Sequence, residues 1–357
     1  MNNYQLFGVP VSVEKLKFTL HSCRADVNEI STIQTMFNTH GESRSIELFK
    51  WQYLGALNGT QVVIASDPAS SVFEGAALVA AFSNPMLVNG KPAVGAQAFD
   101  TLTLENHRGK GLFVQLGTKL YENLISNNTS LLFGIPNAAA YPGWTKHLGW
   151  NMIDPLPLIA RPIGTRYVRV RLKLRKPKID AQNIQNSHVQ MVSEVPRDVL
   201  ELFNSSIGTD HTGVIRSYEY LKWRLSRPGS SYRLFEVRGK SGELLAFGVY
   251  ELLLKHGCAL GYVMDLIVNR DSAKTGRVLL RHMIKEMKHR GADLVFAWSM
   301  PGSFPRAMYS RSRFLPFPSR IRPVELHLGY KTFGDLSNDF LKNYSDFGFS
   351  YLDSDTV

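Results

Sequence analysis

A short loop that combines two glycines with two cations could hold a phosphate group. Arg108-Gly109-Lys110-Gly111 follows a β-rich run, residues 99–104, and precedes a segment whose apolar residues recur at helical spacing. A loop between a strand and a helix presents the unpaired amides and partial positive charge of the helix start to an anion. The glycines allow close approach of the backbone. The spacing fits neither a Walker loop nor the GxGxxG dinucleotide fingerprint.

In this setting the loop resembles motif A of the GCN5-related N-acetyltransferase (GNAT) superfamily. That motif, (Q/R)-x-x-G-x-(G/A), holds the pyrophosphate of acetyl-CoA through backbone amides. The matching segment runs from Arg108 to Phe113, with Phe113 where the family has Gly or Ala. The resemblance implies acetyl-CoA, or another acyl-CoA, as co-substrate. It also implies a set of cofactor-binding residues: Leu102, Thr103 and Leu104 near the thioester, Arg108, Gly109, Lys110, Gly111, Leu112 and Phe113 at the pyrophosphate, and Asn137 at the pantetheine arm.

The order of the predicted elements is also that of the family. We expect strands at 17–23, 61–65, 75–82, 99–104 and 130–137, with a turn at 67–71. Helices are expected after Asp26, which with Glu29 resembles a capping pair, from Ser45, after the loop, and through Trp144 to Trp150. The resemblance implies an α/β (α+β) fold, in which a mixed, mostly antiparallel twisted sheet is flanked by helices.

The second half of the chain echoes the first. Ser and Lys-Trp at fixed spacing recur 172 positions later, and an Asp and a Gly recur 165 positions later. The matching pairs are Ser45 with Ser217, Trp51 with Trp223, Asp100 with Asp265, and Gly111 with Gly276. We therefore expect two tandem GNAT-like domains, an N-terminal one at 1–164 and a C-terminal one at 187–357.

The two copies differ at the loop and are joined by a basic segment. Ala273-Lys274-Thr275 stands where the first copy has Arg108-Gly109-Lys110, so we expect a degenerate second domain and acyl-CoA binding in the first alone. In the linker, residues 165–186, apolar and cationic residues alternate over 166–176 and predict a strand with one cationic face. Such a face is either solvated or lines a groove for an anionic substrate or an acidic carrier protein.

Direct attack of an amine on a thioester needs a base for the ammonium and an acid for the thiolate. Asp100 is the candidate base, because it lies at the end of the strand before the loop. Its counterpart Asp265 belongs to the copy that lost the loop, so a structural role is an equal alternative. The family's Tyr is Trp144 here, which makes the nearby Tyr141 the candidate acid; water is the alternative donor.

Composition limits the partners and the compartment. The 357 residues carry a formal net charge of +11, which suits an anionic partner such as CoA phosphates, an acidic carrier, nucleic acid or a membrane surface. The two cysteines and scattered histidines predict no disulfide framework and no metal site. We see no signal peptide and no apolar run near the ~18 residues of a membrane span, and expect a cytoplasmic protein.

The leading hypothesis is a tandem-domain N-acyltransferase that transfers an acetyl or longer acyl group to a small-molecule primary amine. The subgroup that the loop resembles suggests an amino sugar or a cell-envelope precursor as acceptor. A second hypothesis is aminoacyl transfer of the peptidoglycan-bridge type from aminoacyl-tRNA; the intact pyrophosphate loop argues against it and against a nucleic-acid partner. A third is a non-catalytic CoA-binding module, which the missing Tyr favours.

Overall fold

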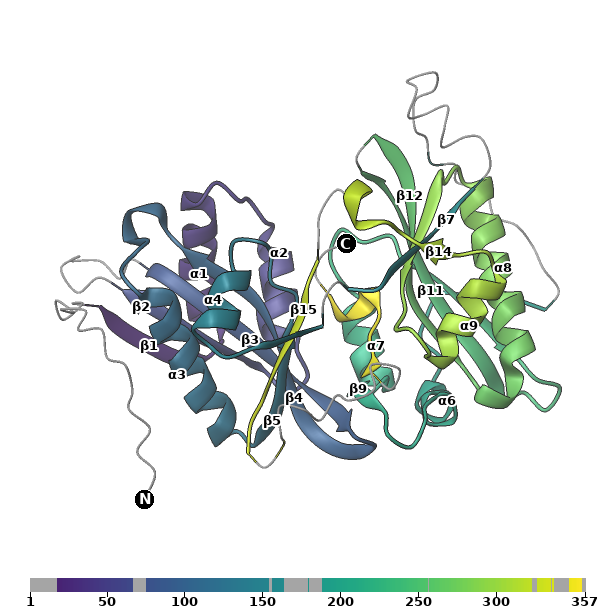
Figure 1. The fold of residues 1–357 in the computed structure, drawn as a ribbon, viewed down its shortest axis with the longest axis horizontal. Helices are drawn as coiled ribbons and strands as arrows, with labels where there is room; N and C mark the ends of the chain where they lie inside the picture. The colour runs from purple at the N-terminus through teal and green to yellow at the C-terminus, as the bar shows by residue number, and fades with distance from the viewer. Residues whose placement is uncertain are drawn as a thin grey trace.

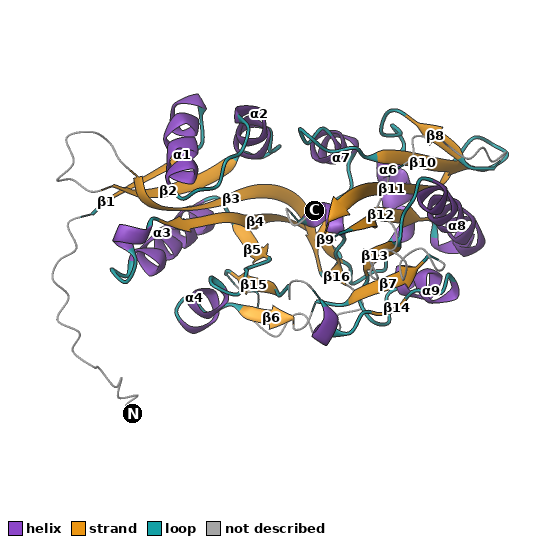
Figure 2. Ribbon diagram, turned by 90° about the horizontal axis from the view of Figure 1, so that it is seen from above, coloured by secondary structure: helices purple, strands orange, loops and turns teal. Residues whose placement is uncertain are grey.

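The computed structural model describes residues 18–66, 75–153, 156–163, 179, 188–255, 257–322, 326–334, 336 and 347–354. Two twisted sheets lie side by side, each flanked by helices (Figure 1). The predicted fold class, mixed and mostly antiparallel, is confirmed. Seen from above, α1 (Val27–Thr39) and α2 (Ile46–Phe49) lie on one face of the first sheet and α3 (Leu112–Ser126) on the other (Figure 2).

Along its main path the first sheet has one parallel pair, β4 with β5, among otherwise antiparallel neighbours, and β9 and β16 form a second parallel pair off this path. Its main path runs β1 (Thr19–Arg24), β2 (Thr60–Ser66), β3 (Gly75–Val88), β4 (Lys91–Thr103), β5 (Thr129–Gly134), β15 (Leu328–Thr332), β6 (Asn151–Ile153). Off this path, β9 (Thr212–Val214) pairs with β3, and β16 (Phe347–Gly348) pairs with β9. A π-helical turn (Lys50–Leu54) continues α2, and α4 (Tyr141–Lys146) follows β5.

The second sheet is built the same way, with β12 and β13 as its parallel pair. Its order is β14 (Leu315–Pro316), β7 (Leu158–Pro162), β13 (Leu294–Trp298), β12 (Cys258–Val268), β11 (Leu244–Lys255), β10 (Arg233–Arg238), β8 (Gln190–Val192). Its helices are α6 (Val199–Ser206), α7 (Tyr218–Leu225), α8 (Ala273–His289) and α9 (Phe304–Arg311). Single 3-10 turns lie at Glu105–His107, Arg270–Ser272, Ser319–Ile321 and Tyr351–Asp353.

The sheets exchange strands along the sequence. β7 precedes residue 164 and yet belongs to the second sheet, whereas β9, β15 and β16 follow residue 187 and belong to the first. The predicted division at 164 and 187 therefore does not separate the two sheets. The predicted basic strand at 166–176 and the turn at 67–71 lie outside the described residues.

Local sequence explains most element bounds. Asp26 caps α1 in a capping box with Glu29, as predicted, and α3 buries Leu112, Leu116 and Leu120 on one side. Several bounds differ from the prediction. β3 runs to Val88 rather than to residue 82, and β5 ends at Gly134 rather than at residue 137. β4 begins at Lys91 rather than at residue 99, because its first half is rich in Ala, Gly and Pro and is held as a strand by pairing with β3. The helix expected to reach Trp150 ends at Lys146, before Gly149 turns the chain at φ 66°.

Trp51 and Trp223 join the two halves. Their rings stack with centroids 5.5 Å apart, and each indole N–H donates to the other residue's carbonyl oxygen, at 2.8 and 3.0 Å. The Arg224 guanidinium lies 5.2 Å from the Trp51 ring. Both rings belong to a core cluster that includes Phe82 of the first sheet and Phe247 of the second, so one apolar core spans the junction.

We expect Trp223→Ala to lower the free energy of unfolding by about 3–5 kcal/mol, because it removes a buried aromatic side chain and the donor to Trp51. Chemical denaturation would measure the change. Leu254→Ala is the matched control, since Leu254 is 57% exposed. A loss no larger than that of the control would contradict a structural role for the Trp pair.

Candidate functional site

The first sheet opens between β4 and β5. Their parallel pairing ends where Ala98 meets Gly134, after which β4 continues to Thr103 paired with β3. The register of β3 against β4 shifts between Val79 and Ala81, so that two residues of β4, Phe99 and Asp100, face one residue of β3. Such a bulge bends the strand that carries it. The bend and the lost pairing leave one edge of β4 unpaired beside an open space.

This space is a cleft with a volume of about 620 Å³. Three segments line it: the end of α1 and the residues after it, the second half of β4 with the loop that follows, and the segment from Gly134 to Trp150. The lining residues are Phe37, His40, Glu42, Arg44, Ala98, Phe99, Asp100, Thr101, Leu102, Thr103, Arg108, Phe113, Gly134, Ile135, Pro136, Asn137, Ala139, Ala140, Trp144 and Trp150.

The glycine loop stands at the end of β4 and is exposed. Gly109 and Gly111 have φ of 75° and 71°, the left-handed region that glycine enters without strain. Gly111 is the N-cap of α3 and offers no side chain to the first amides of that helix. No atom lies within 4 Å of a Cβ built on Gly109. The loop therefore leaves helix-start amides facing solvent beside Arg108, which is the chemistry of an anion site.

The structure brings six of the predicted site residues to the cleft wall: Asp100, Leu102, Thr103, Arg108, Phe113 and Asn137. Leu104, Gly109, Lys110, Gly111 and Leu112 do not line it. The Leu112 side chain is buried in the core beneath α3, and the Leu104 amide donates to the Ala76 carbonyl oxygen at 2.9 Å. Tyr141 also lies outside the lining; it begins α4, and its ring centroid is 4.5 Å from that of His327.

Asp100, the predicted base, is tightly held. Both its carboxylate oxygens accept from Arg44 Nη1, at 2.9 and 2.8 Å, and Tyr53 donates to Oδ2 at 2.8 Å. Burial opposes the charge of Arg44, but Asp100 and then Glu42 outweigh it and raise the pKa of the guanidinium above its ordinary value. An acceptor amine would have to displace Arg44 or Tyr53 to reach this carboxylate. The arrangement fits an anchor between the α1–α2 segment and β4.

The wall of the cleft explains the departure from the family motif. The Phe113 ring lies against Trp144 in a T-shaped contact, with centroids 5.2 Å apart, and Trp144 packs on Trp150 at 4.3 Å. A Cβ on Gly143 would come within 2.5 Å of the Phe113 ring. The large residue in the motif is thus accommodated by a glycine in α4. Asn137 uses its Oδ1 to accept the Ala140 amide at 2.9 Å, which leaves its amide group to face the cleft.

Sequence reasoning missed the contribution of the α1–α2 connection, which brings His40, Glu42 and Arg44 to the cleft. A signal for Arg44 was present, because Arg44 and Arg216 are 172 positions apart, the spacing of the two Trp residues. Like Arg44, Arg216 binds the aspartate on the neighbouring strand, with Nε 2.8 Å from Asp265 Oδ2.

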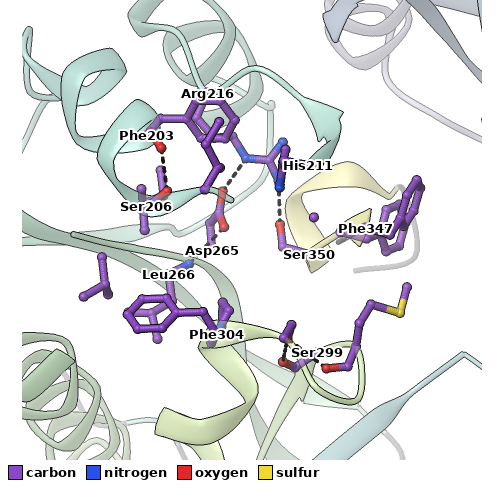
Figure 3. A pocket seen from close by; sticks show the side chains of 18 of the residues that line it. Phe203, Ser206, His211, Arg216, Asp265, Leu266, Ser299, Phe304, Phe347 and Ser350 are labelled. Atoms are coloured by element: carbon purple, nitrogen blue, oxygen red, sulfur yellow. Dashed lines mark hydrogen bonds and ion pairs between the residues drawn. The ribbon is translucent and has the colours of Figure 1, made fainter. Parts of the chain in front are cut away.

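The second sheet opens in the corresponding place, but the chain itself enters the opening. Pairing of β12 with β13 ends at Tyr262 and Phe296. The Tyr351 ring stacks on Trp298 with centroids 4.0 Å apart and meets Tyr262 edge-on at 5.3 Å. A cavity of about 130 Å³ remains; Figure 3 shows Asp265 and Ser350 held by Arg216 at its edge, with His211 and Phe347 nearby.

One group of side chains among the described residues could hold a metal. Donor atoms of His21, Cys23 and Glu29 lie within 4.8 Å of one another on β1 and the first turn of α1. Glu29 Oε2 already accepts the Asp26 amide, and burial together with the Glu29 carboxylate raises the pKa of the Cys23 thiol to about 12. These features favour a protonated thiol, and we assign no metal to the group.

Comparison with known proteins gives the fold. No protein-family model and no curated protein sequence matches the chain. Among solved structures, a probable N-acyltransferase from Enterococcus faecalis V583 superposes with a TM-score of 0.60 at 11% identity, covering 88% of this chain and 72% of its own. Saccharomyces cerevisiae N-myristoyltransferase with bound myristoyl-CoA superposes with a TM-score of 0.59 at 12% identity, covering 88% and 79%.

The chain has the GNAT fold. The fold that the resemblance implied is confirmed, and the two structural neighbours are a probable N-acyltransferase and an N-myristoyltransferase. At 11–12% identity the likeness says nothing about individual residues. Among the described helices, none combines the length and the apolar character that crossing a bilayer requires.

Arg44→Met should destabilise the fold by about 3 kcal/mol, because it leaves Asp100, only 8% exposed, without its cation. In the double variant Arg44→Met/Asp100→Asn the loss of stability should be smaller, since the uncompensated charge is gone. Denaturant titration of Arg44→Met, Asp100→Asn and the double variant would measure the coupling free energy between the two side chains. Additive losses would show that the two side chains are independent.

His211 predicts an acid-sensitive fold. Burial, and after it Arg216, lower the pKa of His211 to about 4, and its ring packs against Gly213 and Gly348. Because the folded pKa lies below the unfolded one, this group stabilises the fold above about pH 6.5, and the contribution is lost as the pH falls towards 4. Between pH 7 and 4.5, the free energy of unfolding of His211→Gln should therefore fall by about 2 kcal/mol less than that of the parent, as measured by denaturant titration at each pH.

His147→Gln, at an exposed position, is the control and should lose as much stability as the parent. Equal losses in all three proteins would refute the assignment.

Proposed function

We propose that this protein is an acyl-CoA-dependent N-acyltransferase, and that the cleft between β4 and β5 is its active site. The observation that carries the proposal is the opening of the sheet after Ala98 and Gly134, with the Arg108–Gly111 loop at the end of the same strand. An unpaired strand edge suits an extended, amide-bearing arm, and a helix start suits its phosphates. The bound myristoyl-CoA of a structural neighbour supports the same class of co-substrate.

In this proposal the loop amides, with Arg108 and Lys110, bind the pyrophosphate. Among Leu102, Thr103 and Leu104, Thr103 is the best donor to the thioester. The Leu104 amide points to β3, where it bonds Ala76, and amides alternate in direction along a strand. The Leu102 amide then also points to β3, and that of Thr103 to the cleft. A donor placed there would stabilise the oxyanion that forms when the amine attacks.

The acceptor's proton has several possible routes. The amine nitrogen attacks the thioester carbon and gives up a proton to a base, the C–S bond breaks, and the departing thiolate takes up a proton to become the free thiol of CoA. Asp100 and Tyr141 stay the predicted base and acid, although Asp100 is occupied by Arg44 and Tyr141 lies outside the cleft lining. His40 lines the cleft on the side of α1 and is exposed, so it is better placed to receive a proton from an incoming amine. Glu42 lines the same side, but its carboxylate, like that of Asp100, is bound to Arg44, at 2.8 Å.

We further propose a single acyl-CoA site per chain, with the second half as a degenerate copy of the first. Tyr351 occupies the opening between β12 and β13, and Asp353 fixes it by accepting from Arg216 Nη1 at 2.8 Å. Arg224 holds the same segment through the carbonyl oxygens of Leu352 and Ser354, both at 2.9 Å. An arm of CoA could enter there only if these contacts broke.

Calorimetry with acetyl-CoA and with myristoyl-CoA tests the proposal. We expect one site per chain, and at least a 100-fold loss of affinity in Gly111→Glu, because a carboxylate at the helix start repels phosphate and the side chain strains a left-handed backbone. Gly229→Glu is the matched control, with φ 83° and open space around it in the second half. Failure of both thioesters to bind would reject the proposal, and two sites would reject the degenerate copy.

A CoA-binding module without catalysis is the second candidate. Two observations favour this candidate: the Asp100 carboxylate is already bound to Arg44, and Tyr141 does not line the cleft. Release of free thiol from acetyl-CoA in the presence of amino sugars and other primary amines would separate the two. Turnover that falls in His40→Ala or Glu42→Gln supports an enzyme, and tight binding without thiol release supports the module. The acceptor class, amino sugar or cell-envelope precursor, would follow from the same screen.

A further inference from the structure

The outward face of α8 is a continuous stripe of positive charge. Lys274, Arg277, Arg281, Lys285 and Lys288 recur every three or four residues, and all are exposed or half-exposed. At 3.6 residues per turn they fall within an arc of about 80° and extend about 21 Å along the helix axis. In the described part of the chain, none of the five forms an ion pair with a carboxylate. The acidic residue of α8, Glu286, is buried on the opposite side.

Two further arginines widen the stripe. Arg161 lies on β7, and Arg313 follows α9 with φ 62°. Burial, and then the charges of Arg313 and Arg281, lower the pKa of Arg161. Arg161 Nη1 donates to the Ser312 carbonyl oxygen at 2.7 Å, which fixes it in this position. We call the five cations of α8, Arg161 and Arg313 the basic face.

The fold does not require this charge. α3 and α8 are counterparts: along the chain, α3 connects the parallel strands β4 and β5, and α8 connects the parallel strands β12 and β13. On α3, Lys119 pairs with Glu122 at 2.7 Å, and the other residues of that face are mostly uncharged. On α8 the cations stand next to one another at i,i+3 and i,i+4, where like charges repel and weaken a helix. A partner that supplies negative charge would remove this repulsion.

We propose that the basic face docks the protein on an anionic membrane surface. Apolar side chains stand within the face: Val278 is 41% exposed on α8, and Leu315 is 64% exposed on β14, which pairs with β7 beside Arg161. Cations mixed with exposed apolar side chains fit the interface of a bilayer that contains anionic lipid. Nucleic acid is the weaker match, because α8 has no Phe, Tyr or Trp on which a base could stack and exposes an aliphatic side chain beside its cations instead.

The place of the basic face in the molecule suits such docking. α8 and α9 lie at the end of the second half that points away from the first sheet (Figures 1 and 2). The cleft between β4 and β5 belongs to the first sheet, so a protein docked through α8 keeps that cleft free. The inference does not rest on the proposed acyl transfer, since it uses none of the cleft residues.

Co-sedimentation with vesicles tests the proposal. The probes are vesicles of phosphatidylcholine alone and vesicles with about 30 mol % phosphatidylglycerol, at roughly 50 and 300 mM salt. We expect binding to the anionic vesicles alone, weakened at the higher salt, and a drop of more than tenfold in the partition coefficient for Arg281→Glu/Lys285→Glu. Lys91→Glu/Lys146→Glu makes the same change in net charge at exposed positions of the first half, and should bind nearly as the parent does.

Other outcomes overturn the proposal. These are no sedimentation with anionic vesicles, equal losses in the two double variants, equal binding to phosphatidylcholine, or tighter binding to a structured RNA in fluorescence anisotropy at the same salt. Circular dichroism would check that the α8 variant is folded. Lys288→Glu, at the exposed end of the helix, provides a milder variant with a smaller expected loss. Thiol release with a soluble amine reports on the cleft separately, so a failure of docking and a failure of acyl transfer can be distinguished.

Discussion

In each sheet two parallel strands separate part-way along their length, and the backbone groups exposed there need new hydrogen-bond partners. Where β4 leaves β5, and again where β12 leaves β13, backbone groups lose their ladder partners. Buried groups of this kind need other partners, and exposed ones are free to bind a ligand. In the first sheet the opening stays accessible as the candidate cleft. In the second, Tyr351 and the residues around it fill it, so the same backbone geometry gives one open and one closed site.

The segments beside each opening are fixed by buried charge. Asp100 holds Arg44 in the first half, and Arg216 is shared by Asp265 and Asp353 in the second. A buried ion pair contributes little net stability when its desolvation is counted, but it allows one geometry and penalises others. Arg216, with two carboxylates, therefore ties the C-terminal segment to the second sheet. Arg44, with Glu42 and Asp100, fixes the wall of the cleft on the α1 side.

The two halves also cannot be considered separately. β15 completes the first sheet beside β5, and β7 completes the second beside β13, so each sheet needs a strand from the other part of the sequence. The reciprocal bonds of Trp51 and Trp223 lie at the centre of this exchange. Pairing over such long sequence separations is costly to form but cooperative once made. The cleft is thus held by a core that spans the whole chain.

Sequence patterns predicted the parts of this structure that local chemistry specifies. The capping box at Asp26, the helical spacing in α3, and the loop between strand and helix are short-range features, and each is where it was expected. The exchange of β7 and β15 was missed, because short strands carry no mark of which sheet they join. Arg44 was missed because a cation before a helix is usually a surface residue, and its partner Asp100 lies 56 positions away.

The glycines show why a repeat in sequence need not repeat a site. Gly111 ends a loop at φ 71°, where a Cβ would meet only the Gln115 side chain, at 3.9 Å, and it leaves the helix start of α3 accessible to an anion. Gly276, its counterpart, lies inside α8, where a Cβ would come within 2.6 Å of Val268 and 2.7 Å of Met308. The first glycine is required by backbone conformation and the second by close packing. Because α8 begins directly after the turn Arg270–Ser272, the second half has no glycine loop at its helix start. This difference in backbone, more than the change of side chains, argues for a single phosphate site.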